Sequence, residues 1–498
     1  MTFCGTTRCK LAAVFLLGLL ISQILSFIHV HQSNIAYRDA LDAITAAGYL
    51  AVPNQKAADG LPTYQAAWNG GLFFTFTIGL CLTFLSCLFA HIFRKLPVKR
   101  NLALLLPVSL WLFVVIKANL NGFSSPAFFH FMLIPPVIFY LTTATSASDK
   151  PGKRGTPAVF HITVFTAFVI FSASVSDMNI FLDVRDTLLL NSRIGRRINA
   201  FYYDNSLYSA RVFKSTGQRL LKTCALSPEL DDAVSRRIAA RLIHRDYLPV
   251  ADTAFHHDLY INMKGDDLEL MKKDHVVMTL PLNDFINEYK TVLREFEAQT
   301  DRHGFFRKFT MMSILFNGVL ILFLVMYLPL YMPLKRYTHP MKASIVAGVF
   351  CLSGSFLFFS MLDVSDPLSN DKLNDALSSP LVNNRIAALK YIYRNRIDYN
   401  VLPFYSDITG KENVAERYWF AKNLRYSRDG EAEATLRTLL NDPHFNVVCM
   451  AFHALGYVGS GKDVSLIMEK IRQSDNWYEQ WYGYKALRRL GWKQGKSG

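Results

Sequence analysis

A short polar stretch carries the densest set of side chains that could hold a metal ion. Six candidate ligands fall within fifteen residues, namely His244, Asp246, Asp252, His256, His257 and Asp258. Imidazole nitrogens and carboxylate oxygens bind a divalent metal when their lone pairs converge on one point. The spacing matches no zinc signature. The sequence therefore leaves two alternatives, which are a metal site drawn from His244, Asp252, His256, His257 and Asp258, or a solvated loop before a strand.

Five histidines near the ends of apolar segments raise the possibility of haem ligation. His29, His31 and His130 fall near one end of their segments, whereas His91 and His161 fall near the opposite end. Two bis-histidine haems would need ligands layered in this way. Cytochromes of the b type commonly place two histidines along one helix, however, and no predicted helix of this chain does so. We therefore predict no cofactor, and haem at these five histidines remains an alternative.

Three arginines mark an amphipathic segment that directly follows an apolar run. Arg193, Arg196 and Arg197 alternate with leucine and isoleucine side chains between residues 180 and 198. This composition is typical of a helix lying in the membrane interface with its cations toward the headgroups. We predict that the three arginines contact anionic headgroups or another anionic ligand. The alternative is a packed helix whose arginines pair with acidic groups elsewhere in the domain.

Aromatic side chains near the carboxyl end form a candidate partner-binding surface, with five of them, Trp477, Tyr478, Trp481, Tyr482 and Tyr484, inside eight residues. On one helix these side chains occupy two adjacent faces, and a terminal repeat without a following neighbour cannot easily bury both. Exposed aromatic clusters are typical anchors of protein interfaces. We predict partner contacts at Trp477, Tyr478, Trp481 and Tyr482. The alternative is that they cap the repeat or pack on a neighbouring domain.

The chain contains no motif that assigns a catalytic chemistry. We find no phosphate-binding loop, no nucleophile elbow and no HExxH sequence. Two polar residues lie inside apolar runs. Lys117 is close enough to the end of its run for its ammonium to reach the interface, and we predict that Asn317 hydrogen-bonds to another helix. We therefore predict no catalytic residue, and an enzymatic activity stays an open alternative without a motif to support it.

Seven apolar runs are long enough to position these groups in a membrane, since a helical span takes about 20 residues. They cover residues 11–28, 71–93, 102–120, 126–145, 158–175, 310–333 and 343–362. Short Lys/Arg-rich loops stay in the cytoplasm, and the loop from Lys335 to Lys342 is one of them. The first run is too long for a cleaved signal. We predict a multi-pass protein of the cell inner (cytoplasmic) membrane with a cytoplasmic amino terminus and an extracytoplasmic carboxyl terminus.

The apolar runs divide the chain into four predicted regions. Residues 1–176 hold spans one to five, 177–307 form an extracytoplasmic α+β domain, 308–362 form the hairpin of spans six and seven, and 363–498 form an extracytoplasmic repeat domain. Within the α+β domain we expect a helix that begins at Ser227-Pro228, strands at 258–263, 268–272 and 275–282, and a final helix at 283–300.

A repeat follows the last apolar run. Ala388, Ala421, Ala454 and Ala486 recur at intervals of 33, 33 and 32 residues, each inside a helical pattern. Small residues at these positions let helices approach closely, and Asp442-Pro443 opens one repeat unit. The segment from about Leu373 to Trp492 resembles HEAT-type repeats of short period. That resemblance implies an α-solenoid that binds proteins, and it implies no catalytic residue.

Composition narrows the remaining function classes. The 498 residues are 51% hydrophobic with a formal net charge of +15, and much of this excess lies in the basic inter-span loops, so we predict no nucleic-acid partner. The seven cysteines follow no metal spacing. Only Cys224 and Cys449 fall in the outer domains, where the alternatives are a disulfide or two buried thiols.

These observations together predict an integral membrane scaffold or assembly subunit of an envelope complex, with protein subunits and membrane lipid as its partners. A permease or lipid-handling subunit for an anionic amphiphile is one alternative, for which the kink expected at Pro135-Pro136 and the Arg193 cluster would guide the ligand. A haem-binding redox membrane protein is the other alternative.

Overall fold

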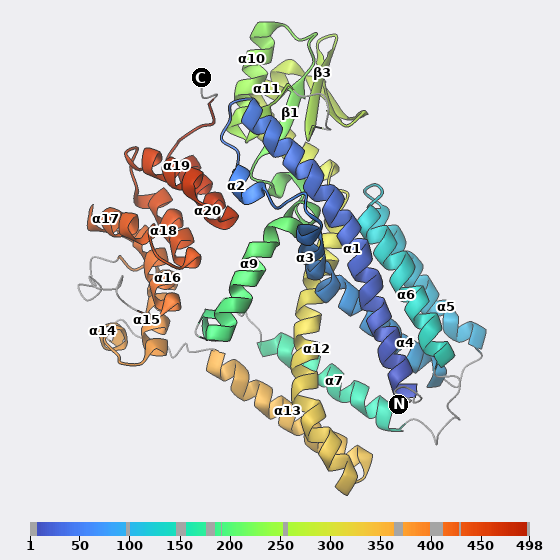
Figure 1. The fold of residues 1–498 in the computed structure, drawn as a ribbon. Helices are drawn as coiled ribbons and strands as arrows, with labels where there is room; N and C mark the ends of the chain where they lie inside the picture. The colour runs from blue at the N-terminus through green and yellow to red at the C-terminus, as the bar shows by residue number, and fades with distance from the viewer. Residues whose placement is uncertain are drawn as a thin grey trace.

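The computed structural model is mostly helical, with one small sheet (Figure 1). It describes residues 7–95, 100–145, 156–175, 185–190, 192–251, 257–362, 372–398, 412–427 and 430–495. Among these, five helical segments are long and apolar enough to cross a membrane, namely Cys9–Ala46, Tyr64–Arg94, Ser125–Thr145, Gly304–Tyr337 and Pro340–Leu357. The predicted multi-pass character is therefore supported. The runs predicted as spans three and five form helices α5 (Arg100–Asn119) and α7 (Thr156–Val175), but they are not among these five, so seven spans stay a prediction.

The first helix, α1 (Thr7–Ala46), is much longer than its apolar run. The sequence predicted a span that ends at Ile28 and a loop from His29, and this boundary was wrong. No glycine or proline interrupts the chain between Ile28 and Gly48, and an ion pair of 2.9 Å joins Arg38 to Asp42 one turn later. The helix therefore continues well past the apolar run and carries its last turns into the outer part of the molecule.

A continuous second span packs along α1 through small residues. It consists of α3 (Tyr64–Phe74), the π-helical turn η1 (Thr75–Gly79) and α4 (Leu80–Lys95). A Cβ on Gly79 would collide with Ser22, so glycine permits this close approach. Asn317 on α12 (Gly304–Tyr337) donates to the carbonyls of Phe76 and Thr77 at 3.0 and 2.8 Å. The predicted helix-to-helix hydrogen bond of Asn317 is thus confirmed, and it binds carbonyls of the π-helical turn.

The remaining membrane helices complete two packed groups. Helix α6 (Ser125–Thr145) lies against α1 and α4, while α7, α12 and α13 (Pro340–Leu362) pack together around Phe168, Phe323 and Cys351. His161 on α7 contacts the Tyr327 hydroxyl at 2.6 Å. Polar side chains therefore join helices inside both groups.

A five-stranded mixed sheet forms the α+β domain. Its order is β2-β1-β3-β4-β5, with β1 parallel to β2 and β3 and the other pairs antiparallel. The strands are β1 (Lys222–Leu226), β2 (Tyr247–Pro249), β3 (Leu259–Lys264), β4 (Asp267–Lys272) and β5 (His275–Pro281). The last three confirm the predicted strands, whereas β1 and β2 were missed because they are short.

Helices α10 (Asp232–His244) and α11 (Leu282–Gln299) supply the core of this domain with Ile238, Leu242, Phe285, Leu293 and Phe296. The predicted final helix is confirmed by α11. The predicted helix start at Ser227-Pro228 was wrong, because the Asp231 carboxylate accepts the backbone N–H groups of Ala233 and Val234 and so caps α10 four residues later.

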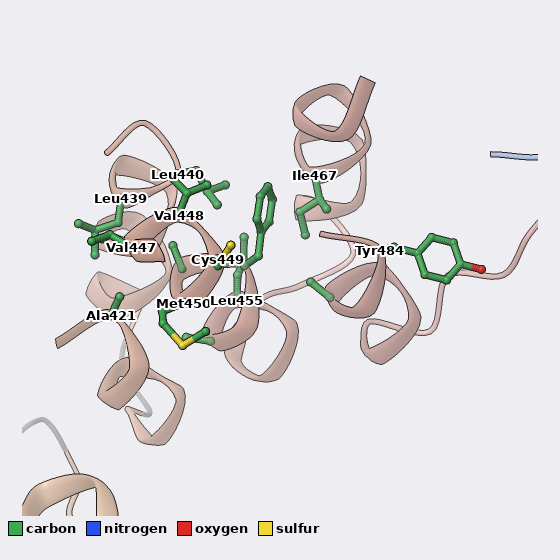
Figure 2. Packing of buried hydrophobic residues seen from close by; sticks show 14 of the residues in the cluster. Ala421, Leu439, Leu440, Val447, Val448, Cys449, Met450, Leu455, Ile467 and Tyr484 are labelled. Carbon is green, nitrogen blue, oxygen red and sulfur yellow. The ribbon is translucent and has the colours of Figure 1, made fainter. Parts of the chain in front are cut away.

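The carboxyl-terminal region is a stack of helices in which consecutive elements pack together. Its helices are α14 (Leu373–Leu377), α15 (Val382–Asn395), α16 (Val414–Asn423), α17 (Gly430–Leu439), α18 (Phe445–Val458), α19 (Asp463–Gln473) and α20 (Trp477–Arg489). Figure 2 shows Ala421, Val447, Cys449, Leu455 and Ile467 in the shared core. The repeating alanines Ala388, Ala421, Ala454 and Ala486 have no exposed surface, so their predicted role in close helix packing is confirmed.

Candidate functional site

The loop after α1 is fastened to the last helix of the repeat. Gln480 on α20 accepts the backbone N–H of Asn54 at 2.7 Å, and Gln494 both accepts from the N–H of Leu50 and donates to its carbonyl. The Asn54 side chain, next to α2 (Gln55–Ala58), donates to the carbonyls of Ile471 and Ser474. Side-chain amides thus satisfy backbone groups of a distant segment. These bonds hold the repeat against the carboxyl-terminal end of α1.

A second attachment centres on Asp186 in η3 (Arg185–Leu190). Its carboxylate accepts from the Trp419 indole at 2.7 Å and lies 3.1 Å from the Lys390 ammonium. Arg185 pairs with Asp186 and stacks over the Tyr418 ring at 4.0 Å. Because Asp186 is nearly fully buried, its charge needs these donors. The segment that follows the fifth predicted span is therefore anchored to α15 and α16.

The third attachment joins the sheet domain to α20. It uses Asp246 and His244, which belong to the polar stretch considered above as a possible metal site. The Tyr484 hydroxyl donates to Asp246 at 2.6 Å, and Arg488 pairs with the same carboxylate at 3.2 Å. Arg488 also donates to the carbonyl of His244. Burial raises the pKa of Asp246, although Tyr484 and Arg488 oppose this increase. Both residues therefore help dock α20.

The other candidate metal ligands have partners of their own. Asp258 lies 2.5 Å from Arg219, and His244 contacts the Tyr289 hydroxyl at 3.2 Å. Asp252 and His256 lie outside the described residues. Within the described ranges, no group of three or more histidine, cysteine or carboxylate side chains comes together to hold a metal ion. The described residues give the metal alternative no support.

The candidate haem histidines lie on several helices. His130 contacts Ser26 through Nε2 at 3.2 Å and the Pro126 carbonyl through Nδ1 at 2.7 Å, so both of its ring nitrogens have partners. His31 packs against Tyr64, and His29 against Phe129. His91 and His161 lie on α4 and α7. Aromatic and polar contacts of this kind need no cofactor, and haem ligation gains no support from them.

The arginines predicted to meet lipid lie at the start of α9 (Arg193–Phe213). Arg193, Arg196 and Arg197 are exposed, and Ile194 and Ile198 beside them are 73% and 55% exposed. Cations and large apolar side chains thus share the exposed surface of one helical segment. This combination suits the membrane interface, and headgroup contact remains a prediction.

The aromatic residues predicted to bind a partner make contacts within the chain. Trp477 donates its indole N–H to the Tyr203 carbonyl at 2.8 Å, and the Tyr478 ring packs on Tyr203 with centroids 4.7 Å apart. Trp481 and Tyr482 are only partly buried. The interaction with α9 matches the alternative in which these residues pack on a neighbouring domain. Partner contact by their remaining exposed surface stays a prediction.

A row of cations and aromatic rings crosses four helices of the repeat. We define the cation–aromatic stripe as Tyr393 on α15, Lys422 and Arg425 at α16 and the turn after it, His453 and Tyr457 on α18, and Lys485 and Arg489 on α20. Lys422 stacks on Tyr393 at 4.2 Å, and both Arg425 and Arg489 stack on Tyr457, at 3.9 and 4.5 Å. The contacts pass from one repeat unit to the next.

The stripe has no counter-charge in the part of the chain that the structure describes. No carboxylate lies within 4.0 Å of Lys422, Arg425, Lys485 or Arg489 among those residues. Burial and neighbouring cations lower the pKa of Lys422 and of Lys485 to about 8, and that of His453 to about 4. The positive charges therefore repel one another, and no carboxylate among the described residues offsets them at close range.

The sequence patterns considered above did not predict this stripe. Four of its residues recur at matching offsets, because Tyr457 and Arg489 follow Ala454 and Ala486 by three positions and His453 and Lys485 precede them by one. Alignment of the repeat units was therefore the available signal. Comparison with known proteins gives no further guide, because the chain matches no protein-family model, no curated protein and no solved structure.

Proposed function

We propose that this protein is an integral membrane scaffold whose helical repeat docks an acidic segment of a protein partner along the cation–aromatic stripe. The single observation that carries the proposal is the unpaired charge of the stripe. Two buried arginines elsewhere in the repeat have carboxylate partners, in the pairs Arg385–Glu416 and Arg417–Asp442, both at 2.7 Å. The four stripe cations have none among the described residues.

The surroundings of His453 strengthen the case for an external acceptor. Arg425 and Arg489 approach the two ring nitrogens of His453, each at 3.2 Å. A neutral imidazole has one acceptor nitrogen, so only one guanidinium can find an acceptor there. A carboxylate placed between the two arginines would accept from both, and such charge-assisted bonds are the strong ones. Aromatic rings beside the cations are also typical of protein interfaces.

The three attachments hold the stripe in a fixed position relative to the rest of the protein. The hydrogen bonds at Asn54, Asp186 and Asp246 join the repeat to the end of α1, to η3 and to the sheet domain. A rigidly held docking surface loses less entropy when a partner binds. The scaffold would therefore present its partner at a fixed position above the bilayer.

A binding experiment on the full-length protein in detergent tests the docking proposal. The triple variant Lys422→Gln/Arg425→Gln/Arg489→Gln should bind a labelled oligoglutamate peptide at least about tenfold more weakly than wild type, equivalent to about 1.4 kcal/mol. The same variant should lose subunits that copurify with wild type from the native membrane. Loss of affinity should shrink as salt is raised, because exposed charges are screened.

The matched control removes three exposed cations of the repeat that lie outside the stripe, in the variant Arg394→Gln/Lys462→Gln/Arg472→Gln. It has the same change in net charge and should bind both the peptide and the copurifying subunits as wild type does. Equal losses in the two variants, or full binding by the stripe variant, would show that the stripe is not the docking surface.

Orientation belongs to the same proposal, because the basic inter-span loops favour an outward carboxyl terminus. Alkaline phosphatase fused after Gly498 should then be active, and a fluorophore that matures only in the cytoplasm should be dark. The reverse pair of results would place the repeat in the cytoplasm and would require a cytoplasmic partner.

A further inference from the structure

A small cavity lies where α1, α9 and α20 meet. Its volume is about 30 Å³, and its lining includes Tyr37, Arg211, Lys214, Arg219, Trp477 and Trp481. One water needs roughly 10–15 Å³ by the same measure. The cavity therefore has room for a small head group, and not for a whole amphiphile.

The lining carries more positive than negative charge. Among the described residues, Asp258 is the carboxylate within 4.0 Å of Arg219 and Arg211, and its oxygen is 2.5 Å from Arg219 but 3.9 Å from Arg211. Lys214 has no carboxylate within 4.0 Å among these residues, and its ammonium stacks between Trp477 and Trp481 at 5.6 and 5.8 Å. Within that distance, one anion serves both arginines and none serves the lysine.

The cavity arginines have N–H donors without a hydrogen-bond acceptor among the residues that the structure describes. The Nε of Arg219 is buried without a hydrogen-bond partner, and the guanidinium of Arg211 is 13% exposed with Asp258 beyond hydrogen-bond distance. A buried N–H donor without an acceptor is costly to the folded chain. Burial, and then the charge of Arg219, lower the pKa of Arg211 to about 10, and burial lowers the pKa of Lys214. An additional anion would relieve both costs.

We infer that this cavity binds a phosphate group held by Arg211, Lys214 and Arg219. Guanidinium forks match the tetrahedral oxygens of phosphate, and a lysine adds a compact charge. The tryptophan rings wall the site and keep water away from these bonds. The site does not include Arg193, Arg196 or Arg197, and it does not depend on the docking proposal.

Two sources of phosphate reach this position. Tyr37 lies nine residues beyond Ile28, where the first apolar run ends, which is a rise of about 13 Å along α1. The cavity is thus outside the hydrocarbon, yet near the bilayer surface. The test therefore compares two ligands, a phosphorylated lipid headgroup and a soluble phosphate.

The test uses the full-length protein in nanodiscs of phosphatidylcholine, titrated with inorganic phosphate at constant ionic strength with chloride as the balancing anion. Binding is measured by calorimetry and by the rise in melting temperature. The Lys214→Gln variant should bind at least tenfold more weakly than wild type. The matched control Lys462→Gln removes an exposed cation just before α19 that does not line the cavity, and it should bind within twofold of wild type.

The lipid arm repeats the titration in nanodiscs that contain phosphatidylglycerol. If this lipid occupies the site, inorganic phosphate will no longer bind to wild type, and native mass spectrometry will detect a retained phosphatidylglycerol that Lys214→Gln lacks. Unchanged phosphate binding in these discs assigns the site to the soluble anion. The inference is overturned if wild type binds neither source, if Lys214→Gln binds as wild type does, or if both variants lose binding equally. Because wild-type binding is measured by itself, its absence would overturn the inference even if a variant does not fold.

Discussion

Two sets of arginines in the helical repeat differ in what surrounds them. Arg385, Arg417 and Arg437 each reach a carboxylate on a neighbouring element at 2.7 Å, and two of those carboxylates, Glu416 and Asp463, have no exposed side-chain surface. Arg425 and Arg489, in the stripe, contact His453 and Tyr457 and have no carboxylate within 4.0 Å among the described residues. The first set joins one repeat unit to the next. Under the docking proposal the second set binds a partner, and we expect it to add little to stability.

The largest expected effect comes from breaking a pair of the first set. Arg417→Met leaves Asp442 buried without its cation, since the two side chains are 7% and 3% exposed. Removal of one partner of a buried pair costs about 3–5 kcal/mol. We expect a large drop in the melting temperature of the full-length protein. Arg425→Met is the matched control and should stay within about 1 kcal/mol of wild type; similar losses in both variants would remove the distinction between the two sets.

The arginines of α9 extend the comparison to a third set, which is exposed and adjacent to apolar side chains. Replacing Arg193, Arg196 and Arg197 together by Gln should weaken attachment to anionic lipid by about 1 kcal/mol for each arginine. The measurement is binding of the 177–307 fragment to anionic liposomes, with the loss shrinking as salt rises. Wild-type binding by the triple variant would mean that these arginines are structural.

A smaller effect is expected where the repeat is held by small residues instead of charges. Ala421→Leu adds volume at a position with no exposed surface, and overpacking of this kind costs about 1–3 kcal/mol. Ala434→Leu, on the exposed side of α17, should change stability by less than about 0.5 kcal/mol. Melting temperatures of the two variants provide the measurement. An equal effect at both positions would contradict the assignment of Ala421 to the contact between helices.

The smallest expected effect is the pH dependence that the two stripe lysines contribute. Burial lowers the pKa of Lys422 and of Lys485 to about 8 from the ordinary value of 10.5. The unfolded chain therefore binds more protons between these values, so the stability contribution of the two lysines rises as pH increases from about 8 to 10.5.

Binding should change in the opposite direction over the same range. As pH rises through 8, the two lysines lose charge, and oligoglutamate should bind roughly two- to fivefold more weakly, as expected for about 0.5–1 kcal/mol. The variant Lys422→Arg/Lys485→Arg remains charged and should show no such loss between pH 7 and 9. If both proteins respond alike, the pH dependence arises outside the stripe.

The sequence by itself determined the elements whose signals are local and periodic. Apolar length located the helices of the membrane part, alternation located β3, β4 and β5, and the period of about 33 residues located Ala388, Ala421, Ala454 and Ala486 at buried helix contacts. Asn317 could be assigned to a bond between helices because an amide inside hydrocarbon needs a partner. These properties depend on neighbours along the chain, so the sequence alone reveals them.

Only the tertiary structure decided which distant groups meet. Gln480 and Asn54 are 426 residues apart, and no local pattern predicts their hydrogen bond or the length of α1 that makes it possible. Arg417 and Arg425 are the same residue type, yet Arg417 pairs with Asp442 whereas no described carboxylate lies within 4.0 Å of Arg425. This difference depends on how successive helices stack. The sequence specifies which side chains are charged, whereas the fold determines which of them meet an opposite charge.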